Sequence, residues 1–132
     1  MTATDVSPSA VDAARENAER LGLDVEVVHA DLFEGTFDAV LSNPPYIATG
    51  DVLPPDVARH EPASALYAGE DGLDVIRRLV ARSAESGVGL LAMEVGMGQA
   101  DAVAALASGA AFGDVSTLRD LAGIERVVVA RR

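Results

Sequence analysis

Cysteine, tryptophan and lysine are absent from this chain of 132 residues, so that all ten basic residues are arginine. Without cysteine the chain forms no disulfide and no reactive thiolate, and two histidines, His29 and His60, make a metal site unexpected. The 21 acidic residues outnumber the basic ones, and the formal charge is -11. This balance argues against a nucleic-acid partner, since a surface that follows phosphates is basic, but it permits a cationic cofactor or a basic protein partner.

Long hydrophobic runs are missing as well. No segment resembles a signal peptide or is apolar enough to span a membrane. We therefore expect a cytoplasmic protein that has no membrane partner. The length suits one small domain with a real core, and we assign residues 1–132 to it.

The first forty residues predict a strand–helix–strand unit and a further strand. An extended segment over 1–6 is followed by Ser7-Pro8, which places an N-cap residue before a proline at the first helical position. The helix is expected to end near Leu21, because Gly22 favours a helix C-terminus. Strands are expected over 24–30 and 37–41, and this order predicts parallel connections in a doubly wound α/β sheet.

The rest of the chain predicts alternating helices and strands. Residues 48–68 are polar and contain three prolines, which indicates a long loop. Asp71 is expected to cap a helix that runs to about residue 86 and buries Leu73, Ile76, Leu79, Val80 and Ala84. We then expect a strand over 88–95, a helix over 99–107 with Val103 and Leu106 inward, and closing strands over 115–118 and 126–130.

The strand over 37–41 runs directly into Asn43-Pro44-Pro45-Tyr46. The prolines end the strand, and Pro44 favours an extended Asn43, so the Asn43 carboxamide and the Pro44 carbonyl should project where open α/β sheets bind ligands. Two adjacent acceptors match the two hydrogens of a planar NH2 group, on an amide or on a base amine. A proline turn that merely closes a strand would explain the prolines, but not the flanking asparagine and tyrosine.

These four residues resemble the NPPY motif of class I S-adenosylmethionine (SAM) methyltransferases that act on amide or amino nitrogen. The segments Glu61-Pro62, Ala65-Leu66 and 69–73 resemble the EP, AL and GxDGL elements that follow this motif in the release factor glutamine methyltransferase (HemK-like) family. The resemblance implies a Rossmann-like sheet, mostly parallel with an antiparallel last strand and helices on both faces. It also implies SAM as cofactor and a protein glutamine as substrate, in a peptide chain release factor or another protein.

By the same resemblance, Asn43 and Pro44 are the catalytic residues, and Pro45 and Tyr46 complete the substrate site. The resemblance also implies that Asn43 lies beside the cofactor. The segment 30–33 resembles the family's adenine-binding segment, so that Leu32 would supply an apolar face for adenine. Its neighbour Asp31 would be an acceptor, or else a solvated turn acid.

Asp5 lies at the end of the first strand, where nucleotide-binding α/β folds place an acid on the ribose hydroxyls. Its position alone equally suits an acid near a helix dipole. The residues that follow Asp5 resemble the family's segment after the ribose-binding acid, which implies that Asp5 binds ribose.

The chain also departs from the family pattern. No G-x-G-x-G occurs, and the sequence begins one strand–helix unit later than the family's catalytic domain, so we expect a partial, N-terminally truncated domain without the helical docking domain. The neighbours of the missing strand would have unpaired backbone groups; a homo-oligomer or another partner could cover them, or the remaining strands could close differently. Two other functions remain open: a non-catalytic binding or assembly module, and a nucleic-acid amino methyltransferase, which the acidic charge disfavours.

Overall fold

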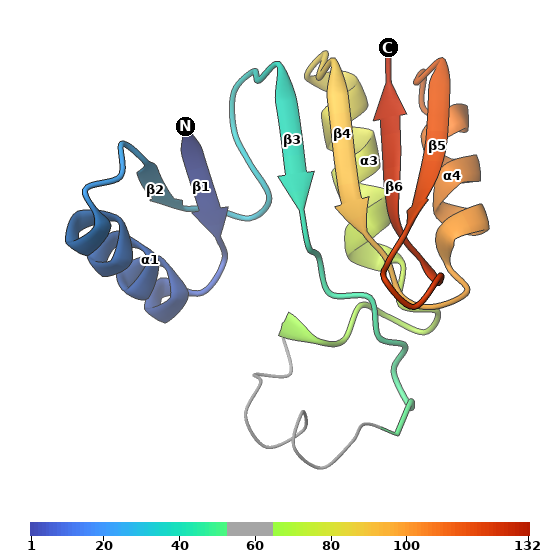
Figure 1. Cartoon of the computed structure of the whole chain (residues 1–132), viewed down its shortest axis with the longest axis horizontal. Coiled ribbons are helices and arrows are strands. Elements are labelled where there is room, and N and C mark those ends of the chain that lie inside the picture. The colour runs from blue at the N-terminus through green and yellow to red at the C-terminus, as the bar shows by residue number, and fades with distance from the viewer. Residues whose placement is uncertain (53–64) are drawn as a thin grey trace. The chain divides into compact units, whose positions relative to one another are not determined.

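The computed structural model describes residues 1–52 and 65–132 (Figure 1). The chain divides into two compact units, Met1–Gly35 and Thr36–Arg132, and each is described by itself. Glu61-Pro62, His60 and the three prolines of the expected loop lie outside the described residues. No helix in the described part of the chain is long and apolar enough to cross a membrane.

The first unit is a strand–helix–strand element. β1 (Thr2–Asp5) pairs in parallel with β2 (Glu26–His29), and α1 (Pro8–Leu21) connects them. The helix buries Val11 and Ala18 on one face, as an amphipathic helix on a small sheet must. The predicted parallel connection is therefore confirmed.

Local signals set both ends of α1. The Ser7 hydroxyl accepts a hydrogen bond from the Ala10 N–H at 3.4 Å, and Pro8 occupies the first turn. Gly22 has a left-handed conformation with φ 63°, so that its N–H donates to the Glu19 carbonyl at 3.1 Å. Both predicted ends are confirmed.

The second unit contains a four-stranded sheet in the order β3-β4-β6-β5. Its strands are β3 (Ala39–Ser42), β4 (Leu90–Glu94), β5 (Asp114–Arg119) and β6 (Glu125–Arg131). β3 and β4 are parallel, whereas β6 is antiparallel to both of its neighbours. The antiparallel last strand that we expected is confirmed.

Two helices, α3 (Asp74–Glu85) and α4 (Ala100–Gly109), lie on the same side of this sheet (Figure 1). Alternate residues of the central strands face these helices and are fully buried, because successive side chains of a strand point to opposite faces. The core between the sheet and the helices includes Leu91, Met93, Val128, Ala130, Ile76, Leu79 and Val103.

Some details differ from the expectations. Leu73, not Asp71, is the N-cap residue of α3; Asp71 instead accepts the Leu73 N–H at 3.1 Å one turn earlier. Ser83 is fully buried on α3, whereas the neighbouring Ala84, which we expected to be inward, is half-buried. On α4 the expected Leu106 is also only half-buried, since it lies at the edge of a surface hollow.

The described residues form two sheets rather than one continuous doubly wound sheet. The break separates the segments 1–6 and 37–41, between which the sequence predicts a missing strand. β1 pairs only with β2, and β3 only with β4, among the strands of the described residues. Self-association through these edges stays a prediction.

Candidate active site at the strand ends

The turn after β3 presents the predicted substrate residues. Ser42, the last residue of β3, lies opposite Met93 of β4, so Asn43 and Glu94 are next along two parallel strands, at their carboxyl ends. The Asn43 side chain is exposed and makes no hydrogen bond with the other described residues, whereas Pro44 is buried. The buried Pro44 therefore holds a turn from which the Asn43 carboxamide is exposed.

The chain beyond Tyr46 is held by a short parallel pairing that the sequence did not predict. The Ile47 N–H donates to the Leu66 carbonyl, and the Ala68 N–H donates to the Ile47 carbonyl, both at 2.9 Å. The expectation that the prolines end the strand is confirmed, because β3 ends at Ser42, and this bridge is a separate, isolated one. Ile47 carries the N–H that both prolines lack, which allows pairing to resume there.

The side chain of Gln99 connects three segments of the chain by hydrogen bonds. Its Nε2 donates to the Tyr46 carbonyl at 2.9 Å and to the Asp71 carbonyl at 3.4 Å, and its Oε1 accepts the Gly96 N–H at 2.8 Å. Our sequence reasoning missed this residue. The available signal was its place between the carboxyl end of a predicted strand and a helix, where α/β folds build their sites.

Tyr46 is also tied to β4 by its side chain. Its hydroxyl donates to Glu94 Oε1 at 3.5 Å, the long limit of a hydrogen bond, and both side chains are half-buried. The aromatic ring is therefore fixed at its polar end beside the strand ends. This arrangement suits the expected role of Tyr46 as a wall of a substrate site.

The loop before α3 is fixed by an ion pair. Arg77 Nη1 donates to Asp71 Oδ1 at 3.0 Å and to Asp74 Oδ1 at 3.1 Å, and its Nη2 also pairs with Asp71. Hydrogen bonds from Arg77 and from the Leu73 N–H lower the pKa of the Asp71 carboxyl to about 2. Asp71 is thus an ionised structural group near neutral pH, and its main-chain carbonyl faces Gln99.

Of the predicted cofactor residues, Asp5, Asp31 and Leu32 lie in the first unit, and Asn43 lies in the second. Asp5 ends β1, and its Oδ1 accepts the Ser7 N–H at 2.7 Å. The Asp5 carbonyl accepts the Ala30 N–H at 3.1 Å, so the segment with Asp31 and Leu32 leaves β2 beside the end of β1. The structure therefore brings Asp5 together with Asp31 and Leu32, the candidate adenine-binding residues, at the carboxyl ends of the two strands.

Leu32 has an unusual backbone. Its φ is 63°, a left-handed conformation that branched and bulky residues rarely adopt, and its carbonyl accepts the Thr4 hydroxyl. The side chain is half-buried, while Asp31 beside it is exposed. A strained leucine at a strand end is a feature often associated with ligand sites.

These residues fit the adenosine part of SAM. Asp5 is exposed, and a carboxylate that spends one acceptor site on Ser7 keeps others for ribose hydroxyls. Leu32 offers an apolar side chain for a base. The substrate candidates lie in the second unit, and each set is considered within its own unit.

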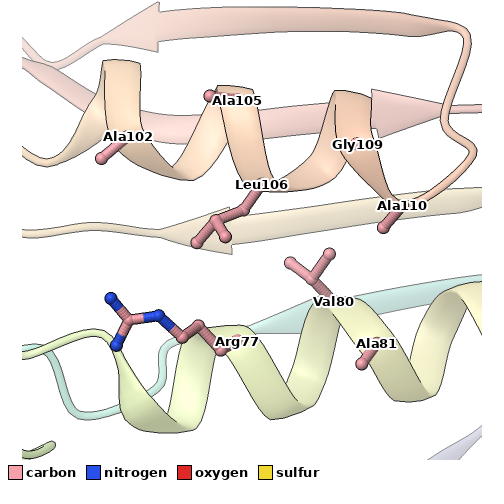
Figure 2. A pocket seen from close by; sticks show the side chains of 8 residues that line it. All are labelled: Arg77, Val80, Ala81, Ala102, Ala105, Leu106, Gly109 and Ala110. Atoms are coloured by element: carbon pink, nitrogen blue, oxygen red, sulfur yellow. The ribbon is translucent and has the colours of Figure 1, made fainter.

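A hollow of about 490 Å³ lies elsewhere, between α3 and α4. Figure 2 shows Val80 and Leu106 pointing toward one another across it, with Arg77 at one end. Alanine residues make up most of the remaining lining, and the Arg77 guanidinium is paired with Asp71 and Asp74. With no other polar side chain in its lining, this hollow has no catalytic group to offer.

Known proteins resemble this chain in sequence. A family model described as "Methyltransferase small domain" matches residues 1–60. The release factor glutamine methyltransferase of Deinococcus radiodurans is 47% identical over 139 residues, which cover 100% of this chain and 49% of that protein. That of Gloeobacter violaceus is 45% identical over 141 residues, which cover 96% of this chain and 48% of that protein. The chain spans about half the length of the curated relatives it matches.

A solved methyltransferase from Pyrococcus furiosus aligns with a TM-score of 0.68 at 17% identity, over 98% of this chain and 61% of that one. At this identity the likeness shows the fold, which is that of Rossmann-like class I methyltransferases. The expected fold class is thereby confirmed. Within this class, the sequence relatives are more specific: the two release factor glutamine methyltransferases named above are 47% and 45% identical to this chain, over about half of their own length.

Proposed function

We propose that this chain supplies the adenosine-binding and amide-binding groups of a SAM-dependent N-methyltransferase that modifies the side-chain amide of a protein glutamine. The exposed Asn43 carboxamide beside the buried Pro44, at the carboxyl end of β3, carries the proposal. The names of the relatives support a peptide chain release factor as the protein that carries the glutamine.

The proposed chemistry rests on two acceptors. The Asn43 Oδ1 and the Pro44 carbonyl oxygen each accept one hydrogen of the substrate NH2 group, which fixes the plane of the amide. An amide nitrogen is weakly nucleophilic because its lone pair is conjugated, so orientation is the main contribution that the protein makes. The two carbonyl dipoles also stabilise the positive charge that develops on this nitrogen.

The remaining groups position the reactants. SAM, when bound, supplies an electrophilic methyl group. Asp5 accepts hydrogen bonds from the ribose hydroxyls, and Leu32 covers one face of the adenine, while Asp31 is an acceptor beside it. Pro45 and Tyr46 wall the substrate side, and Tyr46 is held there by Glu94 and Gln99.

Methyl transfer to a defined peptide tests the proposal. The chain is incubated with SAM that carries a labelled methyl group and with a glutamine-containing peptide, and the product is located by mass spectrometry. We expect label on the glutamine side-chain nitrogen, and Asn43→Ala should lower the rate by roughly two orders of magnitude through lost orientation. Asn17→Ala, which removes the other asparagine of the chain from α1, is the matched control and should keep the rate.

The alternatives give different results. Label on an RNA or DNA oligonucleotide but not on the peptide would mean a nucleic-acid amino methyltransferase. Binding of S-adenosylhomocysteine without any transfer would mean a binding module. An Asn43→Ala variant that transfers methyl groups at the wild-type rate would show that the turn is structural, and each of these outcomes contradicts the proposal.

A further inference from the structure

Gln99 holds the chain that follows the substrate turn, and we propose that it is a positioning residue for Asn43 and Pro44. The inference rests on the proposed function for its catalytic consequence. Its structural content, that Gln99 fixes the geometry of the turn, is independent of the reaction.

The Gln99 side chain points away from its own helix. It is the N-cap residue of α4, yet its side chain makes no capping hydrogen bond, although side chains at this position commonly accept an N–H from the first helical turn. Instead, Nε2 donates to the carbonyls of Tyr46 and Asp71, 53 and 28 residues away in sequence, while Oε1 accepts the Gly96 N–H. The Nε2 group therefore joins the α4 N-terminus to two distant segments, and Oε1 holds the carboxamide against the local turn at Gly96.

The surrounding backbone is shaped to admit this carboxamide. A β-carbon at Gly96 would lie 2.7 Å from Gln99 Oε1, and one at Gly72 would lie 2.9 Å from Gln99 Nε2. Real β-carbons essentially never come this close to another heavy atom. Glycine at both positions thus leaves the space that the Gln99 amide occupies.

A shift of Tyr46 is transmitted through the backbone to Asn43 and Pro44, the proposed catalytic residues. Only Pro45 separates Tyr46 from Pro44, and each proline has a fixed φ, so few backbone angles can absorb a shift of the Tyr46 carbonyl. A movement of Tyr46 therefore displaces the Pro44 carbonyl and the Asn43 carboxamide. A misplacement of an ångström at the reacting group is enough to lower a rate substantially.

Two substitutions of similar size separate positioning from packing. Gln99→Glu keeps the shape and the acceptor for Gly96, but presents an acidic group to the Tyr46 and Asp71 carbonyls. When ionised this group has no donor, whereas the protonated form regains one. Gln99→Met keeps bulk and has no donor at any pH. Asp101→Asn, on the exposed surface of the first turn of α4, is the matched control.

The first readout does not depend on catalysis. In amide NMR spectra of the full chain near pH 7.5, we expect Gln99→Glu and Gln99→Met to shift the Asn43 side-chain signal and the Ile47 amide signal. Lowering the pH to about 5 should return both signals toward their wild-type positions in Gln99→Glu only, because an acid beside carbonyl oxygens has a raised pKa. Glu94 and Asp71 are the other carboxyls of this network; spectra of the wild type at both pH values account for them, and Asp71 stays ionised.

The second readout is the methyl transfer rate. A positioning role predicts that kcat falls by roughly tenfold or more in both variants, while the KM for SAM changes less, because Asp5, Asp31 and Leu32 lie in the other unit. In Gln99→Glu the loss of kcat should be smaller near pH 5, relative to the wild type at the same pH.

Unchanged Asn43 and Ile47 signals in both variants would overturn the inference, as would a shift without recovery of Gln99→Glu at low pH. If the wild type itself transfers no methyl group to glutamine, the proposed function fails, and the NMR spectra still decide whether Gln99 sets the turn. If Gln99→Glu does not fold near pH 7.5, Gln99→Met decides: shifted signals support the inference, and wild-type positions overturn it.

Discussion

The carbonyl oxygen of Tyr46 lies so close to Gly72 that a β-carbon on Gly72 would be 2.3 Å from it. Gly72 also has φ +73°, a conformation that favours glycine. Gly98 has a similar φ of +83° but nothing within 4 Å of its β-carbon position. Both glycines thus have a positive φ, but only Gly72 has other atoms close to its β-carbon position.

We predict that Gly98→Ala lowers the free energy of unfolding by about 1–2 kcal/mol, the cost of a left-handed alanine. Gly72→Ala should lower it by a further ~1–3 kcal/mol, because the methyl group must displace Tyr46. Denaturation in urea measures both values. Equal losses in the two variants would mean that the Tyr46 turn yields easily, contrary to a rigid substrate site.

Leu32→Gly should separate binding from folding. Glycine tolerates the φ of 63° without strain, so the free energy of unfolding should stay equal or rise slightly. The affinity for S-adenosylhomocysteine should fall roughly tenfold, since an apolar face for adenine is lost. Calorimetric titration measures the affinity, and Leu23→Gly, at an exposed leucine of the same unit, is the control. Equal affinities for the wild type and Leu32→Gly would remove Leu32 from the proposed cofactor site.

Ser83→Ala should stabilise the protein. The Ser83 side chain is fully buried, and its hydroxyl oxygen has no hydrogen-bond partner within residues 1–52 and 65–132. Removing a buried hydroxyl without a partner gains about 1 kcal/mol, and alanine also favours the helix. Thermal unfolding of Ser83→Ala and of Ser108→Ala, an exposed helical serine, separates these contributions. A smaller gain for Ser83→Ala than for Ser108→Ala would indicate that the hydroxyl is satisfied in solution.

Acid should weaken the loop before α3 through Asp71. Arg77 and the Leu73 N–H lower its pKa from 3.8 to about 2. The folded state therefore favours the ionised form of Asp71. The resulting stability is present above about pH 4 and is lost as the pH falls toward 2. Urea unfolding measured at several pH values should therefore show less loss between pH 4 and 2 in Asp71→Asn than in the wild type. Asp101→Asn should follow the wild type, and a parallel loss in Asp71→Asn would contradict this role.

The predictable features of the fold are those with local causes. Ser7-Pro8 and Gly22 set the ends of α1 through groups within a few residues, and these ends are as expected. The N-cap of α3 was misplaced because Asp71 offers its carboxylate to the Leu73 N–H and to Arg77 instead of to the helix. A sequence pattern cannot weigh such competing partners for one side chain.

The residues of the candidate site also differ in whether local sequence could predict them. The place of Asn43 and Pro44 just after a strand could be predicted, because prolines at a strand end restrict the chain strongly wherever they occur. Gln99 was not found, since its role depends on carbonyls that are distant in sequence and that any residue could provide. Contacts of a side chain with main-chain atoms leave no pattern of residue types to read.

The strand order also bears on how this protein is made. β6, which ends at Arg131, lies between β4 and β5, although both precede it in the chain. Synthesis proceeds from the amino end, so β4 and β5 leave the ribosome before the strand that must separate them. Their edges then stay open until residues 125–131 emerge, and the second unit can close its sheet only after synthesis of this last strand. A ribosome that stalls before residue 125 would hold a product with exposed strand edges, a natural target for chaperones.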